Sequence, residues 1–444
     1  MAAHAAATDG GPTLQSGWSA MAAVYWQIES AGSHGKLLIA SVVLVLVSFL
    51  LSVQVDVNDF SLHHFYRNRL VRCYLGASNP HRKPQRFTGF DPDDDLPLIW
   101  LSGDYPGPYP ILNAALNITA GEELGYATRR AKSFVFTPLY CGYERNRPGR
   151  GVSRFLPANV DDSTFSPTHD TYYPTFAPTS LGRTKSHWGQ PAIEGMGGIK
   201  LGTAMAISGA AASPNMGYYT RPGTALLMTL FDVRLGWWMG NPRYQQWQST
   251  GPRIGLYYLF SELIAQSDQN KSYVYLSDGG HFENLAVYEL IRRRCKLIVA
   301  CDADCDGKYQ FDNLLGLIEK ARADFGAQIV IDCDKIRPAE GQRTSARNYA
   351  VGTIYYDPQQ PEDHGTFIYI KTSMPPREAK PGPEQDQLPD DVWQYYDKHI
   401  TFPHQSTADQ WFDELQFESY RALGEHIGKA AAEEIGEKIK EVFR

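Results

Sequence analysis

The apolar residues of the chain form one long unbroken run near its start and many short runs after it. Leu37 to Val53 reads LLIASVVLVLVSFLLSV, seventeen positions without a charge, and the run extends to Val55 if Gln54 is admitted. At about 1.5 Å per residue, this length lies at the short end of what spans a ~30 Å hydrocarbon core. The pattern predicts a transmembrane helix over residues 37–55, with a buried core helix or strand as the alternative.

Basic residues are distributed unequally on the two sides of this run. Residues 1–36 contain one Lys or Arg, Lys36, whereas six follow soon after it: Arg67, Arg69, Arg72, Arg82, Lys83 and Arg86. The positive-inside rule therefore predicts a single-pass membrane protein whose C-terminal side is cytoplasmic. All six cysteines lie on that side, which fits a reducing compartment. A signal peptide is disfavoured because residues 1–36 precede the run and no small-residue cleavage site follows it.

Short apolar runs separated by Gly and Pro predict strands after the membrane segment, over residues 96–101, 109–118 and 133–139. Residues 144–192 are rich in Arg, Pro, Thr, Ser and Tyr without a clear period, which predicts an irregular lid, binding loop or disordered insertion. Residues 1–36 are rich in Ala and Gly, and we expect them to be the remnant of a longer upstream region.

The clearest pattern begins at Tyr273, where strand-like runs alternate with apolar residues at helical spacing. The predicted strands are 273–276, 297–300 and 328–331, and the predicted helices are 282–293 and 311–325. Short connections between such elements predict parallel strands with right-handed crossovers, and hence an α/β sheet covered by helices. The expected domain, residues 56–444, is completed by two further β-like runs and a helical tail: 352–356, 366–371 and 407–444.

The composition narrows the class of protein. The 444 residues are 43% hydrophobic and 20% charged with a net charge of −7, so nucleic acid is not an expected partner. The cysteines are too few and too irregularly spaced for a disulfide-built domain, and the absence of a C-x-x-C pair disfavours structural zinc. We expect neither a cofactor nor a metal.

A carboxylate follows the strand-like run YVYL, in the sequence Ser277-Asp278-Gly279-Gly280-His281. Ligands of open α/β sheets gather at the carboxyl ends of strands, and two glycines allow a tight turn there. Asp278 could orient or deprotonate a nucleophile at this position. The alternative is an Asp–Gly turn that only caps the next helix, with Gly279 and Gly280 as its turn residues. His281 could add a polar group near Asp278, but a histidine that faces solvent at the start of the helix is the favoured interpretation.

A second acidic cluster, Asp302 to Gly307, reads D-A-D-C-D-G and matches the opening of a calcium-binding loop. The twelfth position of that loop should be a bidentate Glu, but Asn313 stands there. The predicted context is also strand-to-helix, whereas a calcium loop joins two helices. A solvated acidic loop is the favoured interpretation.

No serine lies in a G-x-S-x-G sequence, the elbow that exposes a nucleophile above an α/β sheet. Ser208, in Ala206-Ile207-Ser208-Gly209-Ala210, has small neighbours, and Gly197 and Gly198 on its approach could form an oxyanion loop. The favoured alternative is a tightly packed helix or strand of small residues over 201–212.

Four blocks together resemble the patatin-like phospholipases. Ser277–Gly280 is similar to the family's D-G-[GA] block, and Ala206–Pro214 to a segment that packs beside its active site. Phe134–Leu139 resembles the F-x-F-[TS]-P strand of the cytosolic phospholipases, and Phe402–Trp411 the C-terminal block of large bacterial membrane-associated members. The resemblance implies an α/β fold of the patatin-like type, with a parallel sheet, preceded here by one transmembrane helix.

The resemblance also implies a lipid acyl hydrolase, of the phospholipase A or carboxylic ester hydrolase type, in which Asp278 is the base of a Ser–Asp dyad. The family's oxyanion loop and G-x-S-x-G serine should precede these blocks, and the 444 residues contain neither. We therefore expect the C-terminal portion of such an enzyme, inactive alone, with a phospholipid or other acyl lipid as substrate, the membrane as partner and the nucleophile on an upstream polypeptide. Two alternatives stay open: an active hydrolase that uses Ser208 with Asp278, and a non-catalytic membrane binding or assembly protein.

Overall fold

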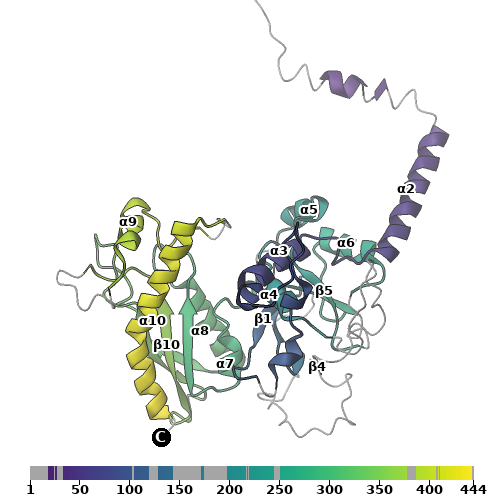
Figure 1. Cartoon of the computed structure of the whole chain (residues 1–444). Coiled ribbons are helices and arrows are strands. Elements are labelled where there is room, and N and C mark those ends of the chain that lie inside the picture. The colour runs from purple at the N-terminus through teal and green to yellow at the C-terminus, as the bar shows by residue number, and fades with distance from the viewer. Residues whose placement is uncertain are drawn as a thin grey trace, which may run out of the picture.

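Figure 1 shows the computed structural model of the chain, in which helices and two sheets form a mixed α/β fold. We call residues 56–287 the N-terminal lobe and residues 288–442 the C-terminal lobe. The structure describes residues 19–24, 26–27, 34–102, 105–119, 129–143, 172–174, 198–216, 218, 220–244, 251–377, 387–406, 409 and 411–442.

Helix α2 (His34–Gln54) extends away from both lobes in Figure 1. Its segment Gly35–Gln54 has a mean hydropathy of 2.6 and none of it is buried, so it is long and apolar enough to cross a membrane. An apolar helix without a protein partner is unstable in water, since its side chains gain nothing from packing. The helix predicted over this segment is confirmed.

The N-terminal lobe contains a six-stranded sheet in the order β4-β3-β2-β1-β6-β5, with every neighbouring pair antiparallel. Its strands are β1 (Leu112–Asn117), β2 (Ala131–Phe136), β3 (Tyr140–Tyr143), β4 (Tyr172–Pro174), β5 (Trp237–Gly240) and β6 (Tyr273–Asp278). The strands predicted over 109–118, 133–139 and 273–276 are confirmed. Of the irregular insertion 144–192, only β4 lies within the described residues.

The strand predicted over residues 96–101 is wrong, because Leu98–Leu101 forms a 3-10 helix. The amide of Leu98 donates to the carbonyl of Ile199 (2.9 Å), and those of Trp100 and Ser102 turn back to carbonyls three residues earlier. A short apolar run does not distinguish such a turn from a strand, since both bury the same side chains.

Helices pack around the N-terminal sheet (Figure 1). They are α3 (His63–Leu70), α4 (Leu201–Ser208), α5 (Pro222–Leu230) and α6 (Gly255–Leu263), with a π-helical turn, Val71–Leu75, continuing α3. Ala204 and Ile207 of α4 are fully buried in one core with Leu116, Phe134 and Leu276 of the sheet. This packing brings the small-residue segment that follows α4 to the end of β6.

The C-terminal lobe contains a second sheet in the order β7-β10-β9-β8. Its strands are β7 (Leu297–Asp302), β8 (Gln328–Ile331), β9 (Tyr349–Tyr355) and β10 (His364–Lys371), and its helices are α7 (Tyr288–Arg292), α8 (Asp312–Phe325), α9 (Asp390–Lys398) and α10 (Glu414–Val442). Phe367 and Tyr369 share a core with Leu317 of α8, whereas Ile368 between them shares one with Ala431 of α10. Alternate side chains of β10 thus pack against helices on opposite faces of the sheet.

The expectation that strands 273–276, 297–300 and 328–331 share one parallel sheet is wrong. β6 pairs antiparallel with β1 and β5 in the N-terminal lobe, and β8 pairs antiparallel with β9. β7 and β10 form a parallel pair. The local pattern identified each strand correctly, but partners are chosen by packing between segments far apart in the sequence.

The helix predicted over residues 282–293 is confirmed only for α7. Gly279–His281 is a 3-10 turn, and Ala286 has a positive φ of 58°, which interrupts a right-handed helix. The carboxylate of Glu283 accepts the amides of Leu285 (2.6 Å), Val287 (2.9 Å) and Tyr288 (3.0 Å), which fixes this kinked entry. The predicted strands and helix at 297–300, 311–325, 328–331, 352–356 and 366–371 are confirmed, and α10 occupies most of the predicted helical tail.

Aromatic contacts connect the two lobes. The ring of Tyr288 lies 4.9 Å from that of Phe282 and 4.7 Å from that of Phe325 on α8. Arg129 and the Tyr288 hydroxyl both bind Asp324, at 2.7 and 2.9 Å. The turn that carries Asp278 is therefore attached to the C-terminal lobe within a few residues of its end.

Candidate functional site

Asp278 is the last residue of β6 and begins a tight turn. Its Oδ1 accepts the amide of Gly280 (2.6 Å), and its own amide donates to the carbonyl of Ala210 (3.3 Å). A Cβ on Gly279 would lie 2.8 Å from the backbone oxygen of Asn113, so the turn requires glycine there. The structure thus places the SDGG turn directly beside the segment that follows Ser208.

The carboxylate of Asp278 is partly buried, and this desolvation raises its pKa although the Gly280 amide acts in the opposite direction. The pKa of the Tyr66 phenol is raised by burial and then by the negative charge of Asp278. Among the residues that the structure describes, Oδ2 of Asp278 has no hydrogen-bond donor. One oxygen of the carboxylate is thus held in place while the other is free to accept a proton.

His281 connects this turn to the same small-residue segment. Asn117 Nδ2 donates to the hydroxyl of Ser277 (2.8 Å), and that hydroxyl contacts Nδ1 of His281 (2.8 Å). Since the backbone carbonyl of Ala211 raises the pKa of His281, we assign Nε2–H as the donor to it and Nδ1 as the acceptor from Ser277. Burial outweighs this effect and lowers the pKa of His281 from 6.5 to about 4.

The expectation that His281 faces solvent is therefore wrong. A histidine at the start of a turn is ordinarily hydrated, but here the neutral ring bridges two segments that meet only in the folded lobe. Ser277, which is fully buried, serves as its partner. His281 thus connects the Asp278 turn to the segment that follows α4.

Ser208 is the last residue of α4 and is half-buried. This is a helix end, whereas the nucleophile elbow is a sharp turn from a strand into a helix. Gly198 precedes α4 and lies near the isolated bridge between Pro97 and Lys200. Gly197 lies outside the described residues. A backbone hydrogen bond joins Ala210 to Asp278, and the Tyr66 hydroxyl lies over Gly209.

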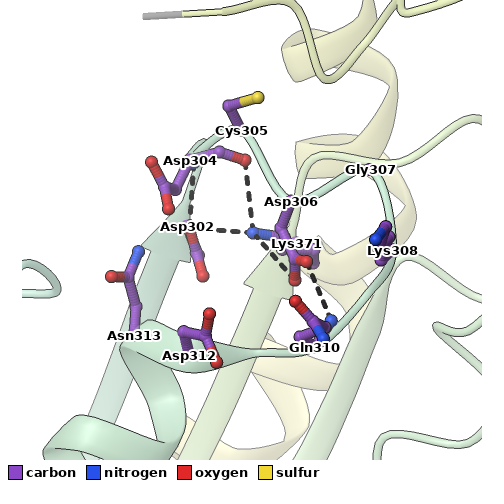
Figure 2. A pocket seen from close by; sticks show the side chains of 10 residues that line it. All are labelled: Asp302, Asp304, Cys305, Asp306, Gly307, Lys308, Gln310, Asp312, Asn313 and Lys371. Atoms are coloured by element: carbon purple, nitrogen blue, oxygen red, sulfur yellow. Dashed lines mark hydrogen bonds and ion pairs between the residues drawn. The ribbon is translucent and has the colours of Figure 1, made fainter.

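The second acidic cluster lines a cavity of about 130 Å³ at the carboxyl ends of the parallel strands β7 and β10 (Figure 2). Nζ of Lys371 lies 3.1 Å from Asp302 and 3.9 Å from Asp306, and it donates to the carbonyl of Asp304 (3.3 Å). Asp302 and Lys371 are buried, and the Tyr369 hydroxyl donates to Asp302 (2.5 Å).

The interpretation of this cluster as a solvated acidic loop is wrong for Asp302. The Lys371 ammonium lies among the oxygens that a calcium ion would need, and Asp306 accepts the amides of Gln310 (2.8 Å) and Phe311 (2.9 Å). No group of His, Cys, Asp and Glu suited to a metal ion exists in the described part of the chain. Sequence reasoning missed Lys371; its signal was a lysine at the end of the apolar run F-I-Y-I-K.

No protein-family model and no curated protein matches the chain.

Proposed function

We propose that this chain supplies the aspartate half of a membrane-associated lipid acyl hydrolase of the patatin-like type. The observation that carries the proposal is the Asp278 carboxylate: partly buried, held at Oδ1 by the Gly280 amide, and without a donor to Oδ2 among the described residues. A base with a raised pKa and an unoccupied oxygen is suited to accept the proton of a serine hydroxyl.

The arrangement around Asp278 supports this role over that of a simple turn. A capping aspartate needs no buried partner, whereas this turn is fixed on both sides, by the Asp278 amide on Ala210 and by His281 between Ser277 and Ala211. Rigid supports of this kind keep a catalytic group in position. The resemblance in the four sequence blocks is the basis for the patatin-like type. The parallel sheet that it implied is not part of the proposal, because β6 pairs antiparallel with β1 and β5.

The nucleophile comes from outside these 444 residues under this proposal, and the substrate is a phospholipid or another acyl lipid. Helix α2 anchors the lobes to the cytoplasmic side of the membrane. An impermeant thiol reagent applied to intact cells should then leave all six cysteines, which are free thiols, unmodified. Rapid labelling of the exposed Cys73, Cys301 or Cys305 would refute this topology.

The function is tested in native membranes, where any partner polypeptide is present. Replacing Asp278 with Asn should slow the release of fatty acid from phospholipid vesicles by about 100-fold or more, the usual contribution of a general base. Ser208→Ala should leave the rate unchanged. Equal losses in both variants would assign the nucleophile to Ser208, and an unchanged rate in Asp278→Asn would refute the hydrolase.

The purified chain provides the complementary experiment. We expect no adduct with a fluorophosphonate probe and no hydrolysis of a short-chain nitrophenyl ester. Ester hydrolysis that Asp278→Asn abolishes would show that the chain carries its own nucleophile, and the split of the dyad between two polypeptides would then be wrong.

A further inference from the structure

Helices α5 and α6 pack against each other and expose apolar side chains on the outside of the N-terminal lobe. We call these side chains the α5–α6 surface, and their exposed fractions run from 42% for Ile264 to 71% for Phe231. The surface consists of Leu226, Leu227, Leu230 and Phe231 with Leu256, Tyr257, Phe260 and Ile264. Contiguous exposed apolar groups of this kind mark an interaction site in a folded protein.

The two acidic residues of the segments that carry the α5–α6 surface are both paired with an arginine, so they do not oppose contact with an anionic lipid. The segments 221–235 and 253–264 contain two acidic residues, Asp232 and Glu262, and both bind Arg234, at 3.0 and 2.8 Å. Arg234 and Glu262 are fully buried. Arg221 and Arg253, at the starts of the two segments, are exposed. The surface is therefore apolar with basic groups at its margin, the pattern of a helix that lies in a membrane interface.

The α5–α6 surface is continuous with the end of the apolar helix α2. A Cβ on Gly255 of α6 would lie 3.5 Å from the backbone oxygens of Ser52 and Val55, so the two helices are in close contact. Figure 1 shows α6 beside the end of α2 that faces the lobe, with α5 next to α6.

The junction between α2 and the lobe is rigidly held. The side chain of Asn58 accepts the amide of Trp238 (2.8 Å) and donates to its carbonyl (2.9 Å). The Arg234 guanidinium also donates to the carbonyls of Val57 and Phe60. The residues that follow α2 are thus bound to the N-terminal lobe, and the α5–α6 surface lies beside the end of α2.

We propose that the α5–α6 surface inserts into the interface of the bilayer leaflet in which α2 ends. Its aliphatic and Phe side chains lie at the acyl boundary, Tyr257 at the headgroup level, and Arg221 and Arg253 among lipid phosphates. The lobe is then a monotopic unit that lies on the membrane and does not hang from a flexible anchor. The proposal rests on the membrane-spanning role of α2 and holds whether or not the protein is a hydrolase.

Backbone hydrogen bonds connect the α5–α6 surface to the candidate site. The amide of Leu235, just after α5, donates to the carbonyl of Ala212 (2.8 Å), and Ala210 and Ala211 of the same segment contact the Asp278 turn. Residues 210–212 therefore link the α5–α6 surface to the Asp278 turn.

The test measures depth in the full chain reconstituted into vesicles of phosphatidylcholine and phosphatidylglycerol. A nitroxide is attached through a genetically encoded ketone side chain at Leu227, Leu230 or Phe260, one site at a time, which leaves the cysteines untouched. The control site is Leu315 on α8, which is 56% exposed in the C-terminal lobe. We expect collision with oxygen, relative to collision with a water-soluble nickel chelate, to be several-fold higher at the three sites than at the control.

A charged variant provides the second arm. Leu230→Glu combined with Phe260→Glu should lower the ratio at site 227 to that of site 315, whereas Leu315→Glu should leave it unchanged. Ratios equal to the control at all three sites would overturn the proposal. Dipolar coupling between copies that disappears on dilution with unlabelled protein would also overturn it, because it would show that a second copy covers the surface. Resistance to carbonate extraction tests the membrane-spanning role of α2 separately. A chain that resists extraction but whose three nitroxides have the collision ratio of the control would refute the insertion of the α5–α6 surface alone.

Discussion

The bridge formed by His281 predicts a pH dependence that can be isolated from all other titrations. The ring is neutral in the folded lobe because burial lowers its pKa from 6.5 to about 4. Protonation would turn Nδ1 into a donor, so the Ser277 hydroxyl would lose its acceptor. The folded state therefore binds this proton less readily than the unfolded state.

The sign and size follow from proton linkage. The group contributes its full stability above pH 6.5, and this contribution is lost as the pH falls toward 4, because the unfolded chain binds the proton over this interval. A pKa difference of about 2.5 corresponds to a loss of about 3 kcal/mol in the free energy of unfolding. His281→Gln retains one acceptor and one donor on a side chain that does not titrate.

The measurement is urea unfolding of the detergent-solubilised full chain at pH 7 and pH 4. The wild type should lose about 3 kcal/mol more than His281→Gln between these values, since other groups titrate equally in both proteins. The exposed His364, replaced by Gln, is the control and should behave as the wild type. Equal losses in the wild type and His281→Gln would refute the neutral bridge.

Two further predictions concern stability, and each has a matched control in urea unfolding. Replacing the buried Lys371 with Met leaves the Asp302 carboxylate unpaired and should cost about 3 kcal/mol or more. Replacing Lys296, which is 58% exposed beside Asp363, with Met should lower the free energy of unfolding by less than about 1 kcal/mol. Equal costs for the two substitutions would contradict the buried pair. Gly279→Ala should cost about 1–3 kcal/mol, because its Cβ would meet the backbone of β1. The control is Gly428→Ala on α10, where a Cβ would meet open space, and it should stabilise the protein by up to about 1 kcal/mol. No change in stability for Gly279→Ala would show that the turn accommodates a side chain.

Local patterns along the sequence were sufficient for most elements of the fold. The run around Leu37–Val53 predicted helix α2, and the alternating segments after Tyr273 predicted β6, β7, α8 and β8. Periodicity of apolar residues reports which side chains are to be buried within one element. It failed at residues 96–101 and 282–287, where hydrogen bonds to a distant carbonyl and from the Glu283 carboxylate decide the backbone path.

The candidate site could be predicted only in part, because local patterns do not report contacts between distant residues. Asp278 was identified because a carboxylate between a strand and two glycines is a local feature. The roles of His281 and Lys371 depend on Ala211 and on Asp302, residues about 70 positions away in each case, which no local pattern reports.

The sequence by itself determined the apolar helix, most of the strands and the residues at the Asp278 turn, since each depends on neighbours a few positions apart. The tertiary structure decided that the strands divide between two sheets, that His281 is a neutral bridge, and that a lysine occupies the acidic cluster. These outcomes depend on desolvation and on pairing between distant segments. Both contribute free energy only after folding has brought those segments together.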